Sequence, residues 1–415
     1  MNKITHNWAE HVAFGHEVTH FPTSLSEVQD TVRAAKKLRP IGSRHSFNAI
    51  ADTPGGIVSL RALERRMEID AAARTVTVDG GITYSELAPV LDAAGWALFN
   101  LGSCPDFTVV GAVATSTHGS GNINRNLAAS VAALDIVTAS GDIVHFKRGD
   151  ADFNGAVVSV GALGVITSLT LDLVPRFDMC QYVYHGLPFE RVTAGFDALM
   201  GSAYSVSLFT HWNGDLVDQA WLKARAEAPP PAPDFFGAHP APGEMSPVMG
   251  KDASGTTAQQ GVVGPWYDRL THVRIGAVPY IGYEYQSEYF VARRHAAAAM
   301  RAIRAIEAQL HPALVVSEIR TIAADDLWLS VTSGADSVGF HFSWQRDWPS
   351  VAKALAVLEA ALAPFAPRPH WGKLFVMEPA AFQPTYPRLD DFRALATRLD
   401  PSGKFRNDFV DKYVS

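Results

Sequence analysis

The chain has 415 residues, of which 47% are hydrophobic and 19% are charged. This composition is globular and excludes a disordered chain, and the length predicts two or three domains. The 35 basic and 42 acidic residues give a formal net charge of −7, without any block of Lys and Arg, so we expect no nucleic-acid and no membrane partner. Two cysteines without a CxxC motif predict neither a disulfide framework nor a metal site.

Residues 1–20 contain no basic segment followed by an apolar one, so they do not resemble a signal peptide. No apolar stretch approaches the roughly 20 residues that a membrane-spanning helix needs. The sequence therefore predicts a cytoplasmic protein.

Short strands and helices alternate in the first third of the chain. Apolar residues at helical spacing predict a helix over residues 24–38, where Ser24 and Glu27 form a candidate capping box. Residues 156–173 form an apolar segment broken by glycines, and Pro175 closes it, so we place the first domain boundary there. The other elements expected in this part are strands at 57–60 and 75–78, a helix at 84–94 and a hairpin over 131–138 and 142–146.

The remainder of the chain predicts a second, mixed unit. Residues 229–264 are rich in Pro, Ala and Gly and predict a long surface loop. The elements expected after it are a helix at 288–310, strands at 315–322 and 338–344, a helix at 349–362, a loop and strand at 370–377 and a helix at 387–399.

Strand periodicity places polar residues on one side of the two predicted strands. Glu318 and Arg320 share one face of the first strand, and His341 and Ser343 share one face of the second. On the strands alone, a solvated face of an antiparallel sheet is the better interpretation, and the lining of a polar pocket is the alternative. Lys373 adds a cation among apolar neighbours.

Three loops combine glycine with hydroxyl side chains, at residues 40–48, 111–121 and 160–167. Their free N–H and O–H groups are the donors that a pyrophosphate needs. Taken singly, each loop is better explained as an ordinary turn. The chain has no GxGxxG and no GxxxxGK[ST] motif, which argues against the Rossmann and P-loop classes.

Taken together, these motifs resemble those of a known family. Gly-Ser-Arg-His-Ser-Phe-Asn at 42–48 and Val-Ala-Thr-Ser-Thr-His-Gly-Ser-Gly at 113–121 resemble loops of the vanillyl-alcohol oxidase type of FAD flavoproteins. Four later motifs are similar to the alditol oxidase (xylitol oxidase) branch: Ser-Glu-Ile-Arg at 317–320, His-Phe-Ser-Trp at 341–344, Arg-Pro-His-Trp-Gly-Lys-Leu-Phe at 368–375 and Asp-Pro-Ser-Gly-Lys-Phe-Arg-Asn at 400–407. The resemblance runs in the same order over essentially the whole chain.

The resemblance implies an α+β, two-domain FAD-binding (PCMH-type) fold. Residues 1–175 would form the FAD-binding domain. Residues 176–370 would form a substrate-binding cap domain built on an antiparallel sheet flanked by helices. Residues 371–415 would return to the flavin and to the FAD-binding domain.

The cofactor implied is FAD, bonded covalently through His45 to the flavin 8α-methyl group. A neutral imidazole can make this bond without a strong base, whereas the ordinary alternative is a turn histidine bonded to backbone. Arg44 stands where the family pattern has glycine, so its backbone is less free. The cofactor-binding residues implied are Pro40, Ile41, Gly42, Ser43, Arg44, His45, Ser46, Ser103, Thr108, Gly111, Thr115, Ser116, Thr117, His118, Val165 and His370.

Cys104 has two interpretations. Its Gly-Ser-Cys-Pro loop resembles that of berberine-bridge-type oxidases, in which a cysteine makes a second covalent link to FAD. The rest of the chain follows the alditol oxidase pattern, which favours a small buried residue without that link.

The activity implied is oxidation of the terminal primary alcohol of alditols such as xylitol and sorbitol to the aldehyde, with reduction of O₂ to H₂O₂. Arg320 and Lys373 would stabilise developing negative charge, and Lys373 or His341 would accept the substrate proton. Glu318, Ser103 and Ser343 would bind substrate hydroxyl groups. Gly102 would leave room for dioxygen.

Three alternatives remain open. An aldonolactone oxidase of the same fold would share the His-Trp-Gly-Lys segment, and a sugar-alcohol dehydrogenase would use an acceptor other than oxygen. A flavin-binding protein without turnover would have no use for the intact set Glu318, Arg320, His341 and Lys373. We expect a monomer or a weak homo-oligomer with a small-molecule polyol and dioxygen as its partners.

Overall fold

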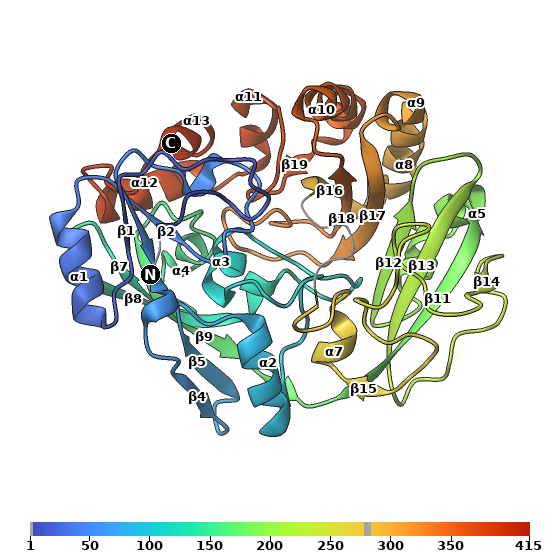
Figure 1. Ribbon diagram of the computed structural model, residues 1–415, viewed down its shortest axis with the longest axis horizontal. Helices are drawn as coiled ribbons and strands as arrows, with labels where there is room; N and C mark the ends of the chain where they lie inside the picture. Colours follow the sequence, from blue (N-terminus) through green and yellow to red (C-terminus); the bar gives the residue numbers. More distant parts are fainter. Residues whose placement is uncertain (1–2, 278–283) are drawn as a thin grey trace.

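The computed structural model describes residues 3–277 and 284–415, and Figure 1 shows two sheet-containing halves side by side. In the first half, a five-stranded antiparallel sheet runs in the order β4-β5-β9-β7-β8, and a parallel three-stranded sheet runs β1-β3-β2. The strands are β1 (Val18–His20), β2 (Leu38–Ile41), β3 (Gly56–Ser59), β4 (Met67–Asp70), β5 (Thr75–Asp79), β7 (Val131–Val137), β8 (Ile143–Lys147) and β9 (Val165–Asp172), and β6 (Trp96–Ala97) pairs with β10 (Val174–Pro175).

The helices of this half begin at residues that suit helix N-termini. Ser24 caps α1 (Leu25–Ala34) by accepting from the Glu27 N–H, and Thr83 and Glu86 form a capping box on α2 (Tyr84–Ala93). The helix expected over 24–38 is confirmed but ends earlier, because the chain turns into β2. The remaining helices are α3 (Val109–Ala114) and α4 (Phe153–Ala156). The expected strands and the β7–β8 hairpin are confirmed.

The second half is built on a large antiparallel sheet in the order β14-β11-β13-β12-β17-β18-β16-β19, with β15 paired to β11. Its strands are β11 (Asp178–Pro188), β12 (Ser205–Thr210), β13 (Leu216–Arg225), β14 (His239–Pro240), β15 (Gly264–Pro265), β16 (Tyr285–Ala292), β17 (Leu314–Ile322), β18 (Ser337–Trp344) and β19 (Arg368–Pro369). The expected strands at 315–322 and 338–344 are therefore neighbours in this sheet.

Helices α8 (Ala296–Arg304), α9 (Glu307–Leu310) and α10 (Trp348–Leu362) cover one side of this sheet, at the upper right of Figure 1. The other α-helices are α5 (Phe189–Ala194), α6 (Phe196–Met200), α7 (Tyr267–Leu270), α11 (Pro379–Phe382), α12 (Leu389–Leu399) and α13 (Asp408–Tyr413). Short 3₁₀ turns are η1 (Ala49–Ala51), η2 (Leu60–Ala62), η3 (Leu127–Ser130), η4 (Arg293–His295), η5 (Ala363–Phe365) and η6 (Gln383–Thr385).

The C-terminal segment returns to the first half of the molecule, where α12 packs against α4 and α13 against η1 (Figure 1). Buried Lys404 fixes this return, since its ammonium donates to the carbonyl oxygens of Val32 and Ala139. The division of the chain at 175/176 and 370/371 stays a prediction.

One expected element is confirmed only in part, and another is wrong. The helix expected at 288–310 is instead the second half of β16, followed by η4, α8 and α9. Its first residues pair with β18 in the sheet interior, and this pairing outweighs the helix propensity of the alanines that follow. No strand forms over 370–377, which is a turn and loop beyond β19.

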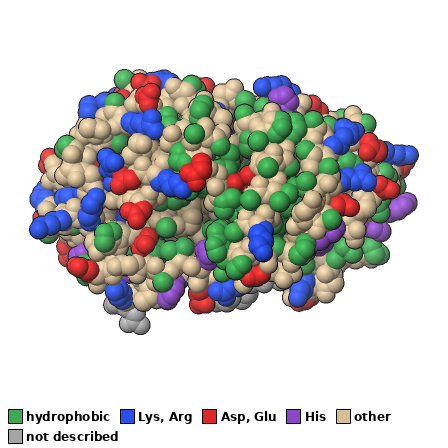
Figure 2. All heavy atoms as spheres, turned by 90° about the horizontal axis from the view of Figure 1, so that it is seen from above, with side chains coloured by type: hydrophobic (Ala, Val, Ile, Leu, Met, Phe, Trp, Pro, Cys, Tyr) green, Lys and Arg blue, Asp and Glu red, His purple; other side chains and the backbone are tan. Residues whose placement is uncertain are grey.

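Apolar residues from both halves form one large buried cluster, which includes Leu134 of β7, Phe340 of β18 and Trp371. Within the described residues, every helix is too short or too polar to cross a membrane. Figure 2 shows acidic and basic side chains interspersed over the face it presents.

Candidate active site

A deep cavity is lined by residues from both halves of the molecule. Its empty space, counted out to the solvent at its mouth, is about 1870 Å³. The first half contributes the loop after β2, the α3 region and the start of β9. The large sheet contributes β16, β17 and β18, together with residues 370–373.

Nearly all of the predicted site residues line this cavity. The exceptions are Ser116 and Gly102, which are absent from the lining. The Ser116 hydroxyl instead accepts from the Val331 N–H at 3.2 Å. The cavity thus gathers residues from sequence positions 40–48, 103–118, 165, 318–320, 341–343 and 370–373.

The lining fits an elongated polar cofactor such as FAD. Among the buried polar atoms on this lining that have no hydrogen-bond partner within the described residues are Nδ1 of His45, Oγ1 of Thr108 and Oγ of Ser159. Buried polar atoms normally have hydrogen-bond partners, so these atoms are suited to bind the polar groups of a ligand. Gly42 lies against Thr108, and a Cβ at Gly42 would lie 2.1 Å from Thr108 Oγ1. Only glycine therefore allows the backbone of the loop after β2 to lie this close to Thr108.

His45 is held as a neutral imidazole. Its ring stacks on Trp8 at 5.2 Å between ring centroids and meets the edge of Phe107 at 4.7 Å. Burial, assisted by Arg44, lowers the pKa of His45 to about 4. His45 therefore presents an uncharged ring with a buried, unpartnered Nδ1 to the cavity at neutral pH.

Arg44 adopts a left-handed backbone conformation with φ +69°. This is the conformation that glycine adopts without cost and that an arginine adopts with strain. Its carbonyl oxygen accepts from the Trp8 N–H at 2.8 Å, which ties the His45 loop to the N-terminal segment. Arg44 therefore replaces the glycine of the family pattern at a position whose backbone keeps the left-handed conformation that favours glycine.

Three acidic and basic side chains form a row across neighbouring strands. In the sheet register, Glu288 of β16 lies opposite His341 of β18, and His341 lies opposite Glu318 of β17. Each of them lines the cavity, so the row faces a buried pocket and is not a solvated sheet face. The polar-pocket alternative for these strands is therefore the correct one.

Two cations hold this row together. Lys373 Nζ lies 2.7 Å from Oε2 of Glu288 and 2.8 Å from Nδ1 of His341. Arg320 donates from Nη2 to Oε1 of Glu288 at 2.9 Å and from Nη1 to Ser103 Oγ at 3.1 Å. The site thus contains two carboxylates and two basic groups in direct contact.

Burial and mutual contact shift the pKa values of these groups. Burial raises the pKa of Glu288, but Lys373 and Arg320 outweigh it and hold the pKa well below its ordinary range. Burial lowers the pKa of Lys373, which Glu288 opposes and Arg320 assists. Burial and Lys373 lower the pKa of His341 to about 4. Perturbed groups of this kind are typical of catalytic sites.

Sequence reasoning missed Glu288, the carboxylate at the centre of this network. Glu284, Gln286 and Glu288 alternate along the chain and all three line the cavity. This period of two was a visible signal for a strand, but the alanine-rich stretch after it led to a predicted helix. Gln286 donates to Glu284 at 2.8 Å, and the other oxygen of Glu284 is buried without a partner.

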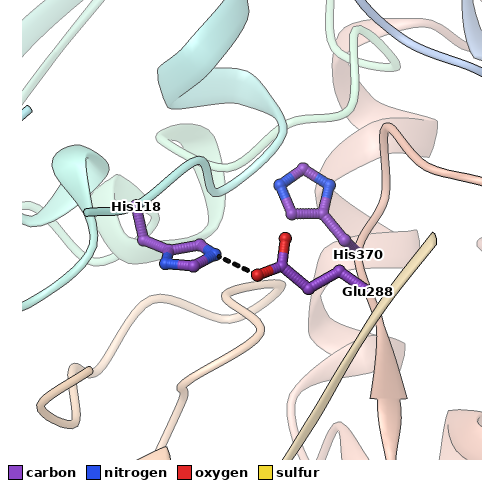
Figure 3. A group of neighbouring side chains, drawn as sticks. All are labelled: His118, Glu288 and His370. Atoms are coloured by element: carbon purple, nitrogen blue, oxygen red, sulfur yellow. Dashed lines mark ion pairs between the residues drawn. The ribbon is translucent and has the colours of Figure 1, made fainter. Parts of the chain in front are cut away.

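Figure 3 shows Glu288 between His118 and His370. One potential ligand atom from each of these residues lies within 4.8 Å of the other two. His118 Nε2 lies 3.2 Å from Oε1 of Glu288, and Nδ1 of His370 accepts from the Gly372 N–H at 3.0 Å. Glu288 is already paired with Lys373 and Arg320, which disfavours a further cation. We interpret the cluster as part of the ion-pair network.

The two cysteines, Cys104 and Cys180, carry free thiols. Cys104 lines the cavity, and burial is the main cause that raises its pKa to about 11. At neutral pH it is a thiol, the form that is a poor nucleophile.

Comparisons with known proteins agree with this architecture. A model described as "FAD binding domain" matches residues 17–147, and a model described as "D-arabinono-1,4-lactone oxidase" matches residues 281–413. The chain is 45% identical over 413 residues to an alditol oxidase of Streptomyces sp., covering 99% of each chain. It is 29% identical to an L-gulono-1,4-lactone dehydrogenase of Mycobacterium tuberculosis, covering 100% of each chain. Among solved structures, a solvent-stable cholesterol oxidase has the same fold, with a TM-score of 0.81 at 18% identity over 98% of this chain and 96% of that one.

Proposed function

The chain belongs to the alditol oxidase branch of the vanillyl-alcohol oxidase type of FAD flavoproteins, and we propose that it oxidises the terminal primary alcohol of an alditol such as xylitol or sorbitol to the aldehyde, reducing O₂ to H₂O₂. The branch is given by the full-length relative at 45% identity, while the lactone-oxidising relatives are more distant.

The observation that carries this proposal is the density of polar groups on one wall of the cavity. Glu288, His341 and Glu318 lie side by side on three strands, and Arg320 and Lys373 link them. A wall of fixed donors and acceptors favours a substrate with several hydroxyl groups, because a substrate without them leaves buried polar atoms unpaired. An open-chain polyol satisfies this requirement.

FAD, when bound, supplies the hydride acceptor and passes the electrons to dioxygen. The protein supplies the charges. The substrate hydroxyl that loses its proton would lie beside Lys373 and Arg320, and Arg320 would stabilise the negative charge that develops on its oxygen. The proton would pass to the Lys373–His341 pair, whose nitrogens are 2.8 Å apart. Glu318, Ser103 and Ser343 bind the remaining hydroxyl groups.

The same site supports covalent attachment of FAD through His45. Its ring is uncharged at neutral pH and its Nδ1 is buried without a partner among the described residues, which are properties that suit a nucleophilic imidazole. The residues that would hold the rest of the cofactor are those of the loop after β2, Thr108, Gly111, Thr115, Thr117, His118 and Val165, all of which line the cavity. Cys104, as a protonated thiol, is not expected to form a second link.

A peroxide assay across substrate classes tests the proposal. Purified flavin-loaded protein is mixed in air with alditols, aldonolactones and small alcohols. Alditols should release peroxide with the highest kcat/KM. Preferential release with an aldonolactone would favour a lactone oxidase, and reduction of an artificial acceptor without peroxide would favour a dehydrogenase.

A further inference from the structure

His272 lies at the junction of the two halves of the molecule and contacts both. It follows α7, and its backbone N–H donates to the carbonyl oxygen of Ser103 at 2.9 Å. Its side-chain Nε2 lies 2.8 Å from Oε1 of Glu318 on β17. One residue therefore joins a loop of the first half to a strand of the large sheet, at two predicted substrate-binding residues.

These contacts close a ring. Arg320 donates from Nη1 to the hydroxyl of Ser103 at 3.1 Å, and its Nε lies 3.5 Å from Oε1 of Glu318. Each of the four residues thus contacts two others. The order around the ring is Ser103, Arg320, Glu318, His272 and back to Ser103. Arg320, Glu318 and His272 are each at most 5% exposed, so the ring is buried.

The surroundings fix the protonation state of His272. Burial raises the pKa of Glu318, but Arg320 and His272 outweigh it, so Glu318 is an anion that only accepts hydrogen bonds. His272 must therefore carry its proton on Nε2. Its Nδ1 is buried without a partner between the edge-on rings of Phe209 and Trp221, and burial lowers the pKa of His272. His272 is thus a neutral donor that orients Glu318 without adding charge.

Lys223 supports the segment that carries His272. Its side chain is 1% exposed, and Nζ donates to the carbonyl oxygens of Arg269 and Thr271, both at 2.6 Å. Because these carbonyl groups immediately precede His272, β13 holds the segment against the sheet. A lysine is seldom buried without a carboxylate in direct contact. We infer that Lys223 is buried here because it fixes the position of residues 269–272.

We propose that His272 is a positioning residue for substrate binding, which aligns Glu318 with Ser103 so that both address one polyol chain. This inference rests on the proposed function. It predicts that loss of the His272 donor weakens substrate binding more than it slows turnover, because Lys373 and His341 do not contact His272.

The test compares His272→Ala, His272→Gln and His272→Asn with xylitol as substrate. The Gln amide reaches as far as Nε2, whereas the Asn amide reaches only to the position of Nδ1. For His272→Ala and His272→Asn, KM should rise about tenfold or more while kcat changes little, since losing one buried hydrogen bond to a charged group has roughly this effect. His272→Gln should restore most of the loss. The flavin-to-protein absorbance ratio and Tm are measured for every variant.

The matched control is His16→Ala. His16 is a buried histidine bonded to Thr19 and lies outside the cavity lining, so its removal should affect Tm but not KM. An unchanged KM in His272→Ala, or equal KM values for the Gln and Asn variants, would overturn the inference. If wild-type protein does not oxidise alditols, the proposed function fails instead, so the two failures are distinguishable.

Discussion

The ammonium nitrogen of Lys373 lies 2.7 Å from Oε2 of Glu288, a carboxylate that the surrounding sheet buries completely. Glu288 favours the protonated form of Lys373, whereas burial and Arg320 favour the neutral form. The balance between them sets the pH at which the Lys373–His341 pair can accept a proton from the substrate.

Replacing Glu288 by Gln should shift the pH profile. Without the carboxylate, the pKa of Lys373 falls further, so the neutral form appears at lower pH. The limb of kcat/KM that rises with pH should therefore move to lower pH, as measured in steady-state assays across the pH range. Glu284→Gln is the control, since Glu284 makes no hydrogen bond to Lys373 and should shift the limb less. A shift to higher pH, or none, would remove Glu288 from this role.

Replacing Lys373 by Ala should leave a yellow, flavin-loaded protein that xylitol reduces at least about a hundredfold more slowly under anaerobic conditions. The loss reflects removal of one member of the Lys373–His341 pair that accepts the substrate proton. Stopped-flow absorbance of the flavin measures the rate. Lys353→Ala, on the exposed side of α10, should reduce normally. Near-normal reduction in Lys373→Ala would mean that Lys373 takes no part in the reaction.

The sequence allowed much of this arrangement to be predicted. The period of two in residues 315–322 and 338–344 placed Glu318, Arg320, His341 and Ser343 on the correct faces. The role of Glu288 was not predicted, because its strand is followed closely by the alanines of α8 and the local pattern indicated a helix. The strand is instead formed by pairing with β18, which is distant in sequence. The role of His272 was not predicted because His272 lies in a loop, where the sequence has no periodicity from which the direction of a side chain could be inferred.

His45→Ala should lose its covalent flavin. Acid precipitation of this variant should release the yellow cofactor into the supernatant, whereas wild-type protein should keep it in the pellet. Cys104→Ala should retain its flavin with an unchanged spectrum and mass, since the Cys104 thiol is protonated at neutral pH. Retained flavin in His45→Ala, or an altered flavin mass in Cys104→Ala, would point to a bond from the cysteine.

Arg44→Gly should stabilise the protein. The left-handed conformation costs an arginine about 1–2 kcal/mol, and glycine loses about 0.5–1 kcal/mol more chain entropy on folding, so the free energy of unfolding should rise by roughly 0.5–1 kcal/mol. Urea unfolding at matched flavin content measures the change. Arg44→Ala loses the same side chain but keeps the strain, so it should show no such gain. A destabilised Arg44→Gly would mean that the Arg44 side chain contributes more than its backbone costs.

The central claim is that this polar wall oxidises the terminal carbon of an alditol. Its most direct test mixes flavin-loaded protein anaerobically with xylitol and with xylitol deuterated at both terminal carbons, following the loss of oxidised-flavin absorbance. We predict full bleaching that is slower with the deuterated substrate, and an aldehyde product. Bleaching by an aldonolactone but not by xylitol, or bleaching by xylitol without an isotope effect or an aldehyde, would contradict the account.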